Sequence, residues 1–133
     1  MAVNVTVERR LILDAPTGVF CFRARNNSGS TRSPGEVVIW DTTVSTDLAF
    51  TTTTSADDAK VIGVVLESIP DQMEGLVQVL GMLESAILKV NGTTDIAAGD
   101  ALSTFTTAGI AAKATAGKAG SFAFALQAYT AND

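Results

Sequence analysis

Alternation of apolar and polar residues, with the two-residue period of a β-strand, dominates the chain. It begins with Val3, Val5 and Val7, each separated by a polar residue, and it resumes over residues 19–25. Successive side chains of a strand point to opposite faces, so this period indicates half-buried strands. Further strands are predicted at residues 36–41, 61–66, 75–81, 86–92, 109–115 and 121–128, with a turn feeding a short strand at residues 96–102.

Helices are not indicated by the pattern. No window of a dozen residues keeps an i, i+3, i+4 apolar stripe with helix caps. The exception is one short helical turn at residues 55–59, where Ser55 could cap a turn containing Asp57 and Asp58. The sequence therefore predicts an all-β fold, a compact antiparallel β-barrel or sandwich, in which residues 1–17 form an N-terminal arm or strand.

Loops are marked by composition. Residues 26–35 carry turn formers at nearly every position and no apolar residue, which predicts an exposed loop or a long hairpin tip. Residues 42–55 hold seven threonines. The run of four at residues 51–54 could be either an edge strand or a connector, and we expect a strand edge. The glycines lie between the predicted strands, and we expect turns or bulges with positive φ there.

Length and composition favour one domain that associates with other chains. The 133 residues suffice for one hydrophobic core, so residues 1–133 should form a single β-rich domain. Charged residues make up 17% of the chain, below the roughly 25% typical of soluble proteins. The apolar share consists mostly of small residues, 20 Ala and 13 Val. Such a surface has too few charges for a solitary monomer.

Charge is distributed unevenly. Residues 1–34 carry a net charge of +3, with all five arginines, whereas residues 35–133 carry −8, with four lysines and twelve acids. An acidic body argues against a nucleic-acid partner. The basic head is either a solvated strand face or a contact for an anionic partner.

Residues for catalysis or metal binding are scarce. The chain has no histidine, which excludes Ser-His-Asp and Cys-His nucleophiles and His-ligated zinc. Cys21 is a single cysteine in an apolar run and should be buried. The acids Asp57 and Asp58, and Asp71 with Glu74, lack metal-binding spacing, and no phosphate-binding glycine motif occurs. We expect no enzyme, cofactor, metal or small-molecule substrate.

Targeting segments and aromatic sites are equally scarce. Residues 1–7 do not resemble a secretory signal, and no apolar run approaches the roughly 18 residues of a membrane helix, so no membrane partner is expected. The six phenylalanines fall mostly at alternating positions expected in the core. Trp40 is the one aromatic residue considered for a contact surface, beside the alternative of sheet packing.

Six short segments occur in order between residues 35 and 128: GEVV (35–38), KVIGVV (60–65), EGLVQVLG (74–81), IAAGDAL (96–102), GIAAKA (109–114) and FAFAL (122–126). In this order the chain resembles the small head decoration, or capsid cement, proteins of tailed bacteriophages. IAAGDAL followed by a Gly-Ile-Ala-x-Lys-Ala strand is the most specific part of the resemblance.

The resemblance implies a structural virion protein without catalysis. Made in the host cytoplasm, it would bind the outer surface of an expanded head as a homotrimer. There it would contact the major capsid protein at threefold or quasi-threefold positions and stabilise the capsid shell. The alternative is a secreted or surface β-module that binds carbohydrate or acts as an adhesin domain.

The expected docking surface is the N-terminal segment, residues 1–10. A strand with Val3, Val5 and Val7 could add to a sheet edge of a neighbouring subunit, while Arg9 and Arg10 pair with carboxylates. Trp40 completes the set of expected partner contacts.

Overall fold

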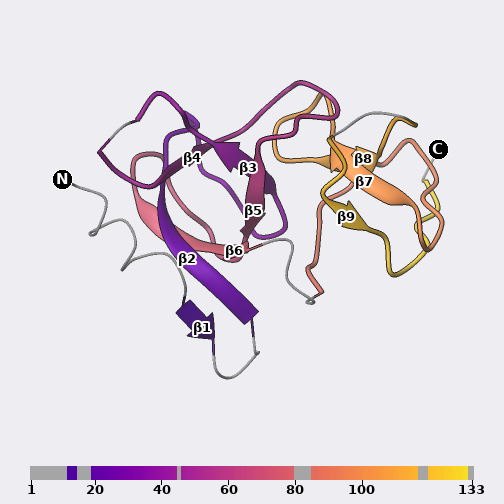
Figure 1. The fold of residues 1–133 in the computed structure, drawn as a ribbon, viewed down its shortest axis with the longest axis horizontal. Helices are drawn as coiled ribbons and strands as arrows, with labels where there is room; N and C mark the ends of the chain where they lie inside the picture. Colours follow the sequence, from indigo (N-terminus) through magenta and orange to yellow (C-terminus); the bar gives the residue numbers. More distant parts are fainter. Residues whose placement is uncertain (1–11, 15–18, 45, 80–84, 117–119, 132–133) are drawn as a thin grey trace.

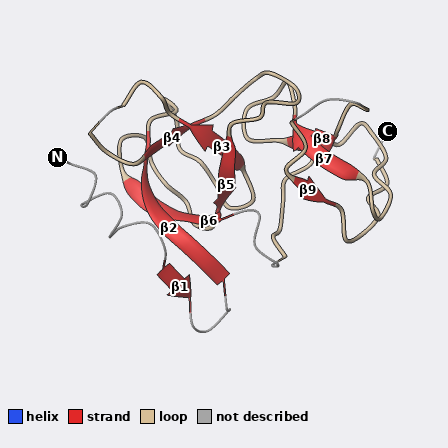
Figure 2. Cartoon of the chain, in the orientation of Figure 1, coloured by secondary structure: helices blue, strands red, loops and turns tan. Residues whose placement is uncertain are grey.

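The structure is a computed structural model that describes residues 12–14, 19–44, 46–79, 85–116 and 120–131 (Figure 1). Within these ranges the regular elements are strands, and there is no helix (Figure 2). Nine strands follow in chain order: β1 (Ile12–Asp14), β2 (Val19–Asn26), β3 (Val37–Trp40), β4 (Ala49–Thr51), β5 (Val61–Val65), β6 (Glu74–Val79), β7 (Ala101–Thr104), β8 (Ala111–Lys113) and β9 (Ala123–Phe124). The all-β prediction is confirmed.

Five strands close into a barrel in the order β2-β4-β3-β5-β6, because β2 also pairs with β6. β1 adds to β2 from outside the ring, opposite residues 19–21. The named strands pair antiparallel, as predicted, with one exception: β2 and β4 run parallel, with Arg25 opposite Ala49. A parallel pair needs a longer connection than a hairpin, and here it includes the whole of β3.

Alternation within the strands divides the barrel residues into two sets. The interior set packs into one cluster, consisting of Phe22, Ala24, Val38, Leu48, Phe50, Val65, Ile69 and Val77. Neighbouring strands place a second set side by side on the opposite face, Cys21 beside Gln78, Gln78 beside Val64 and Val64 beside Val37. This outer stripe is also buried, which confirms the expectation for Cys21.

The remaining three strands form a small sheet in the order β8-β7-β9, beside the barrel in Figure 1. Two contacts tie the outer stripe to the chain around this sheet, one before β7 and one between β7 and β8. Gln78 Nε2 donates to the carbonyl of Ser85 at 3.0 Å, and the Val37 N–H donates to the carbonyl of Gly109 at 2.9 Å. The barrel is therefore covered on this side by its own chain.

The prediction of a strand at residues 86–92 is wrong. The Lys89 N–H donates to Gly35 in the barrel, and the Lys89 carbonyl accepts from Ala111 in β8. Because these bonds go to two different elements, the segment makes only an isolated bridge, between Val90 and Ala111. The strand predicted at residues 121–128 is likewise reduced to the two residues of β9.

Residues 42–59 also differ from the sequence expectation. β4 ends at Thr51 and pairs with β2 on one side and β3 on the other, so it is not an edge strand. The predicted helical turn at residues 55–59 does not form. Asp57 has φ of 57°, in the left-handed region, which a right-handed helical turn excludes.

Residues 26–35 run from β2 to β3, and these two strands do not pair, so the segment is not a hairpin tip. Its middle is exposed, whereas Asn26 and Gly35 at its ends are buried. Of the N-terminal segment expected as an arm or strand, β1 is described, and residues 1–11 and 15–18 lie outside the described ranges.

The expectation that the glycines have positive φ is confirmed at some positions only. Gly35, Gly99 and Gly109 have positive φ, as does Gly29 in the loop. Gly63, in β5, does not have positive φ, and glycine is needed there because a side chain would not fit. A Cβ built there would lie 2.2 Å from the Gln78 carbonyl oxygen, a contact with the backbone of β6.

Replacing Gly63 by alanine should force β5 and β6 apart. We expect Gly63→Ala to lower the free energy of unfolding by about 1–3 kcal/mol, as overpacking does in other cores, measured by urea denaturation. Gly92→Ala is the matched control, because its Cβ would meet only the Tyr129 hydroxyl, at 3.6 Å. Equal stability of the two variants would contradict this account of β5.

Candidate functional site

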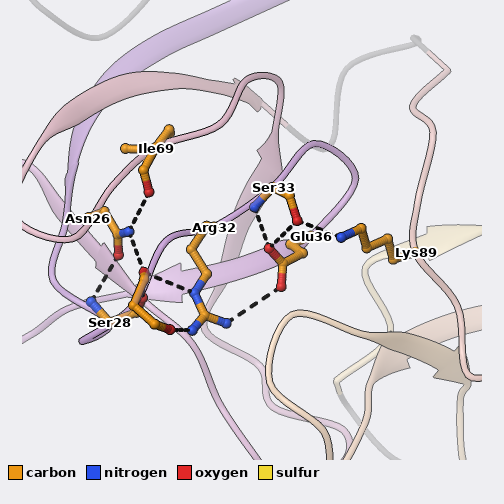
Figure 3. Close-up of polar contacts among 8 residues, drawn as sticks. Asn26, Ser28, Arg32, Ser33, Glu36, Ile69 and Lys89 are labelled. Carbon is orange, nitrogen blue, oxygen red and sulfur yellow. Dashed lines mark hydrogen bonds and ion pairs between the residues drawn. The ribbon is translucent and has the colours of Figure 1, made fainter.

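A group of polar side chains joins the barrel to the small sheet, and we call it the junction cluster: Arg32, Ser33, Glu36 and Lys89 (Figure 3). Glu36 lies just before β3 and is 8% exposed. Its carboxylate accepts hydrogen bonds from the Ser33 N–H and, at 3.1 Å, from the Ser33 hydroxyl. Arg32 Nη1 lies 3.5 Å from the other oxygen, and Lys89 Nζ donates to Ser33 Oγ.

Backbone contacts at the same place hold three segments together. The Gly35 N–H donates to Val65, the Gly35 carbonyl accepts from Lys89, and the Val37 N–H donates to Gly109. Gly109 has φ of 78°, and a Cβ there would lie 2.5 Å from Glu36 Oε1. The glycine thus lets the loop before β8 lie directly against the Glu36 side chain.

Asn26 fixes the loop that leads into the junction cluster. It is fully buried at the end of β2, and its Nδ2 donates to the carbonyls of Ser30 and Ile69, both at 2.8 Å (Figure 3). Its Oδ1 accepts from the Ser28 N–H. Both hydrogen-bonding groups of this amide are satisfied, as burial requires. The loop is therefore held to the barrel by a side chain as well as by its two ends.

A second polar group surrounds Asp41, which directly follows β3. Its Oδ1 accepts from the N–H and the hydroxyl of Thr43, at 2.9 and 2.6 Å, and its Oδ2 accepts from Asn27 Nδ2. The Thr43 hydroxyl, followed by Asn27, holds the pKa of Asp41 below its usual value, against the opposing effect of burial. Arg25 adds a weaker attraction and pairs with Asp47 at 3.4 Å.

Asp100, just before β7 of the small sheet, is likewise held by neighbouring donors. Its Oδ2 accepts from the Ala97 N–H at 2.8 Å and lies 3.0 Å from Lys113 Nζ. The Ala97 N–H, followed by the bond to Lys113, lowers the pKa of Asp100. The acids with lowered pKa are thus held by structural donors, and nothing in these contacts sets up an acid-base pair.

Large apolar side chains on the surface are the other notable feature of the described residues. Phe124, in β9, and Leu126, two residues after it, are 70% and 75% exposed. Both belong to the same alternating set of apolar residues in the sequence. The expectation that the phenylalanines are mostly in the core fails at Phe124, because alternation identifies the residues of one face without telling which face is covered. Trp40, Met73 and Ile87 are also exposed.

The predicted partner contacts can be placed only in part. Trp40 is 42% exposed at the end of β3, whereas Val3, Val5, Val7, Arg9 and Arg10 lie outside the described residues. Of this set, the structure describes Trp40 alone.

Three of the acids weighed as metal ligands accept hydrogen bonds from backbone N–H groups. Asp57 Oδ1 accepts from the Thr115 N–H, Asp58 Oδ1 from the Lys60 N–H and Asp71 Oδ1 from the Gly29 N–H. In the part of the chain that the structure describes, no three Cys, Asp or Glu side chains are grouped to hold a metal ion.

Comparison of the chain with protein-family models, with curated proteins and with solved structures finds no match. The ranges that the structure covers contain no helix with the length and hydropathy needed to cross a bilayer. The candidate surface for function is therefore defined by its own residues, the exposed apolar side chains.

Removing the charge of Glu36 should weaken the junction. In Glu36→Gln an amide replaces one acceptor oxygen that faces donors, so we expect the free energy of unfolding to fall by about 1–3 kcal/mol. Chemical denaturation measures the loss. Glu67→Gln, an exposed carboxylate whose Oε1 accepts from the Leu76 N–H, is the control and should change stability by less than about 0.5 kcal/mol. A loss of the same size in both variants would refute a special role for Glu36.

Acid should remove the contribution of Asp41. Its pKa is lower in the folded chain than in the unfolded chain, so its stabilising effect is complete above about pH 4 and disappears as pH falls through the folded value. Stability measured across this range should fall less steeply in Asp41→Asn than in the parent chain. Thr43→Val should reduce the slope in part and Thr43→Ser should retain it; parallel curves for the parent and Asp41→Asn would disprove the assignment.

Proposed function

We propose that this chain is a head decoration protein of a tailed bacteriophage, which binds the outer surface of the expanded capsid as a homotrimer and stabilises the shell. The observation that carries the proposal is the exposure of Phe124 and Leu126 on a chain with only 17% charged residues. The ordered segments between residues 35 and 128 supply the resemblance to this family.

Exposed apolar side chains support association with copies of the same chain. Phe124 and Leu126 lie on or beside β9, which pairs only with β7 among the described strands. Covering two large apolar side chains contributes about 1.5–3 kcal/mol for each that becomes fully buried. In the proposed trimer these residues lie at the contact between subunits, and cyclic symmetry repeats the contact three times.

A trimer also multiplies its contacts with the shell. If one subunit binds with micromolar affinity, about −8 kcal/mol, a rigid trimer gains further affinity because the second and third contacts form at high effective concentration. The geometry between the contacts must then be fixed. The contacts at the junction cluster support this requirement, since Lys89 binds Ser33 and Gly35, and the Gly109 carbonyl accepts from the Val37 N–H.

The docking contact is assigned to residues 1–10, with the major capsid protein as partner. The alternating Val3, Val5 and Val7 provide one apolar face for strand addition, and Arg9 and Arg10 provide positive charge for carboxylates of the shell. Exposed Trp40 is the third element of this contact. The same exposed tryptophan supports the alternative, a β-module that stacks on a sugar ring.

One comparison of three proteins tests the proposal: the full chain, a variant lacking residues 2–10, and Phe124→Ser combined with Leu126→Ser. Light scattering across a dilution series gives the oligomer mass, and co-sedimentation with expanded heads gives shell binding. We expect the full chain to be a trimer that binds expanded heads tightly and isolated capsid subunits weakly. The deletion should remain a folded trimer without shell binding, and the double variant should dissociate.

Other outcomes have definite meanings. Shell binding by the deletion variant would remove residues 1–10 as the docking contact, and its unfolding would identify them as an ordinary strand of the fold. A monomer that binds neither heads nor capsid subunits would overturn the proposal. Binding of that monomer to a glycan array, lost in Trp40→Ala, would establish the carbohydrate-binding alternative.

A further inference from the structure

Asn91–Gly92 is the single Asn–Gly pair in the sequence. It lies where the segment before the small sheet reaches β8, and the Asn91 N–H donates to the Ala111 carbonyl at 2.8 Å. Asn91 is 9% exposed, while Gly92 and the three residues after it are exposed. The amide is thus held by the fold beside a stretch of chain that water reaches.

Both ends of the Asn91 amide are hydrogen-bonded. Its Oδ1 accepts from the Thr93 N–H at 3.1 Å and from the Thr93 hydroxyl at 2.8 Å. Its Nδ2 donates to Thr94 Oγ1 at 3.3 Å. Two donors on a carbonyl oxygen stabilise the negative charge that this oxygen acquires when a nucleophile adds to its carbon.

The nucleophile adjacent to this carbonyl is the backbone nitrogen of Gly92. Its N–H has no acceptor among the described residues. Glycine carries no side chain to shield that nitrogen, and a Cβ at residue 92 would have met only the Tyr129 hydroxyl. Attack within one chain needs no encounter between molecules, which removes most of the entropic barrier.

We propose that Asn91–Gly92 is a site of self-modification, at which the chain converts Asn91 to aspartate or isoaspartate with water as the only co-reactant. The Gly92 nitrogen gives its proton to water or hydroxide and bonds to Cγ of Asn91. The Cγ–Nδ2 bond breaks, and Nδ2 leaves as ammonia after taking up a proton. The product is a five-membered succinimide ring that includes Cγ, the Gly92 nitrogen and the backbone carbonyl carbon of residue 91.

Water then opens the ring at one of its two carbonyl carbons. Opening at Cγ restores the normal backbone with an aspartate side chain. Opening at the backbone carbonyl leaves the chain running through the former side chain, which is isoaspartate. No oxidant or reductant takes part, and the net change is exchange of the amide nitrogen for an oxygen of water.

The two products differ in their effect on the fold. An aspartate at residue 91 keeps an oxygen that accepts from the Thr93 N–H. Isoaspartate adds one carbon to the backbone between the Asn91 N–H, which bonds to Ala111, and the chain that follows. That product should loosen residues 85–92 from β8, at the segment that also supplies Lys89 to the junction cluster.

The test incubates the full chain in water labelled with heavy oxygen at mildly alkaline pH, followed by peptide mapping and enzymatic methylation of isoaspartate. We expect one labelled oxygen at residue 91, with both products present. Gly92→Ala, whose side chain the fold accommodates, should slow the reaction markedly. Thr93→Val should slow it about three- to tenfold, the value of one hydrogen bond to the reacting oxygen, and Thr93→Ser should restore it.

Absence of labelled product at residue 91 in the full chain, under conditions where a synthetic peptide of residues 87–97 reacts, would overturn the proposal. Equal rates for the parent chain and Thr93→Val would overturn the role given to the two donors. Circular dichroism of each variant before incubation confirms that the compared chains are folded.

Discussion

Closure of the barrel depends on β2, and most of the other features depend on that closure. Residues 21–25 of β2 pair with β6, while Arg25 and Asn26 pair with β4 in the parallel direction. Without the pairing of β2 with β4, β4 would present an open edge, which is a template for unwanted strand addition. The parallel pair is short, with Arg25 opposite Ala49 and Asn26 opposite Phe50, and Phe50 at this point is fully buried.

The end of β2 also positions the junction cluster. Asn26 belongs to the closing pair, and its side chain holds Ser30 and Ile69. The loop that begins there delivers Arg32 and Glu36 to the junction cluster, where Gly109 and Lys89 arrive from the other side. Closure of the barrel and attachment of the small sheet are therefore connected through one loop of the chain.

Much of the fold could be predicted from the sequence, because strands buried on one side leave a two-residue period. The strand at residues 19–26 follows it, whereas the strands at residues 37–40 and 61–65 were predicted from runs of β-branched residues and contain consecutive buried residues. The period does not distinguish parallel from antiparallel neighbours, so the β2–β4 pair was not predictable. Residues 86–92 show the pattern of a strand, although their backbone hydrogen bonds are divided between Gly35 and Ala111. The sequence period cannot tell such a segment from a true strand. Whether a ladder forms there depends on contacts distant in sequence.

The candidate site was predictable to a smaller extent for the same reason. Alternation assigns Phe124 and Leu126 to one face, but only the packed fold shows that this face is exposed. The need for glycine at residue 109 arises from Glu36, 73 positions earlier, and no local pattern carries it. Among the described strands, β1 pairs only with β2, and β8 and β9 pair only with β7, so these three keep one side without a strand partner. The outer side of β8 is partly occupied by the bridge between Val90 and Ala111, and β9 carries the exposed Phe124. In the proposed trimer, contacts between closed barrels would form mainly through side chains, and the exposed large apolar residues of a surface with few charges suit such contacts.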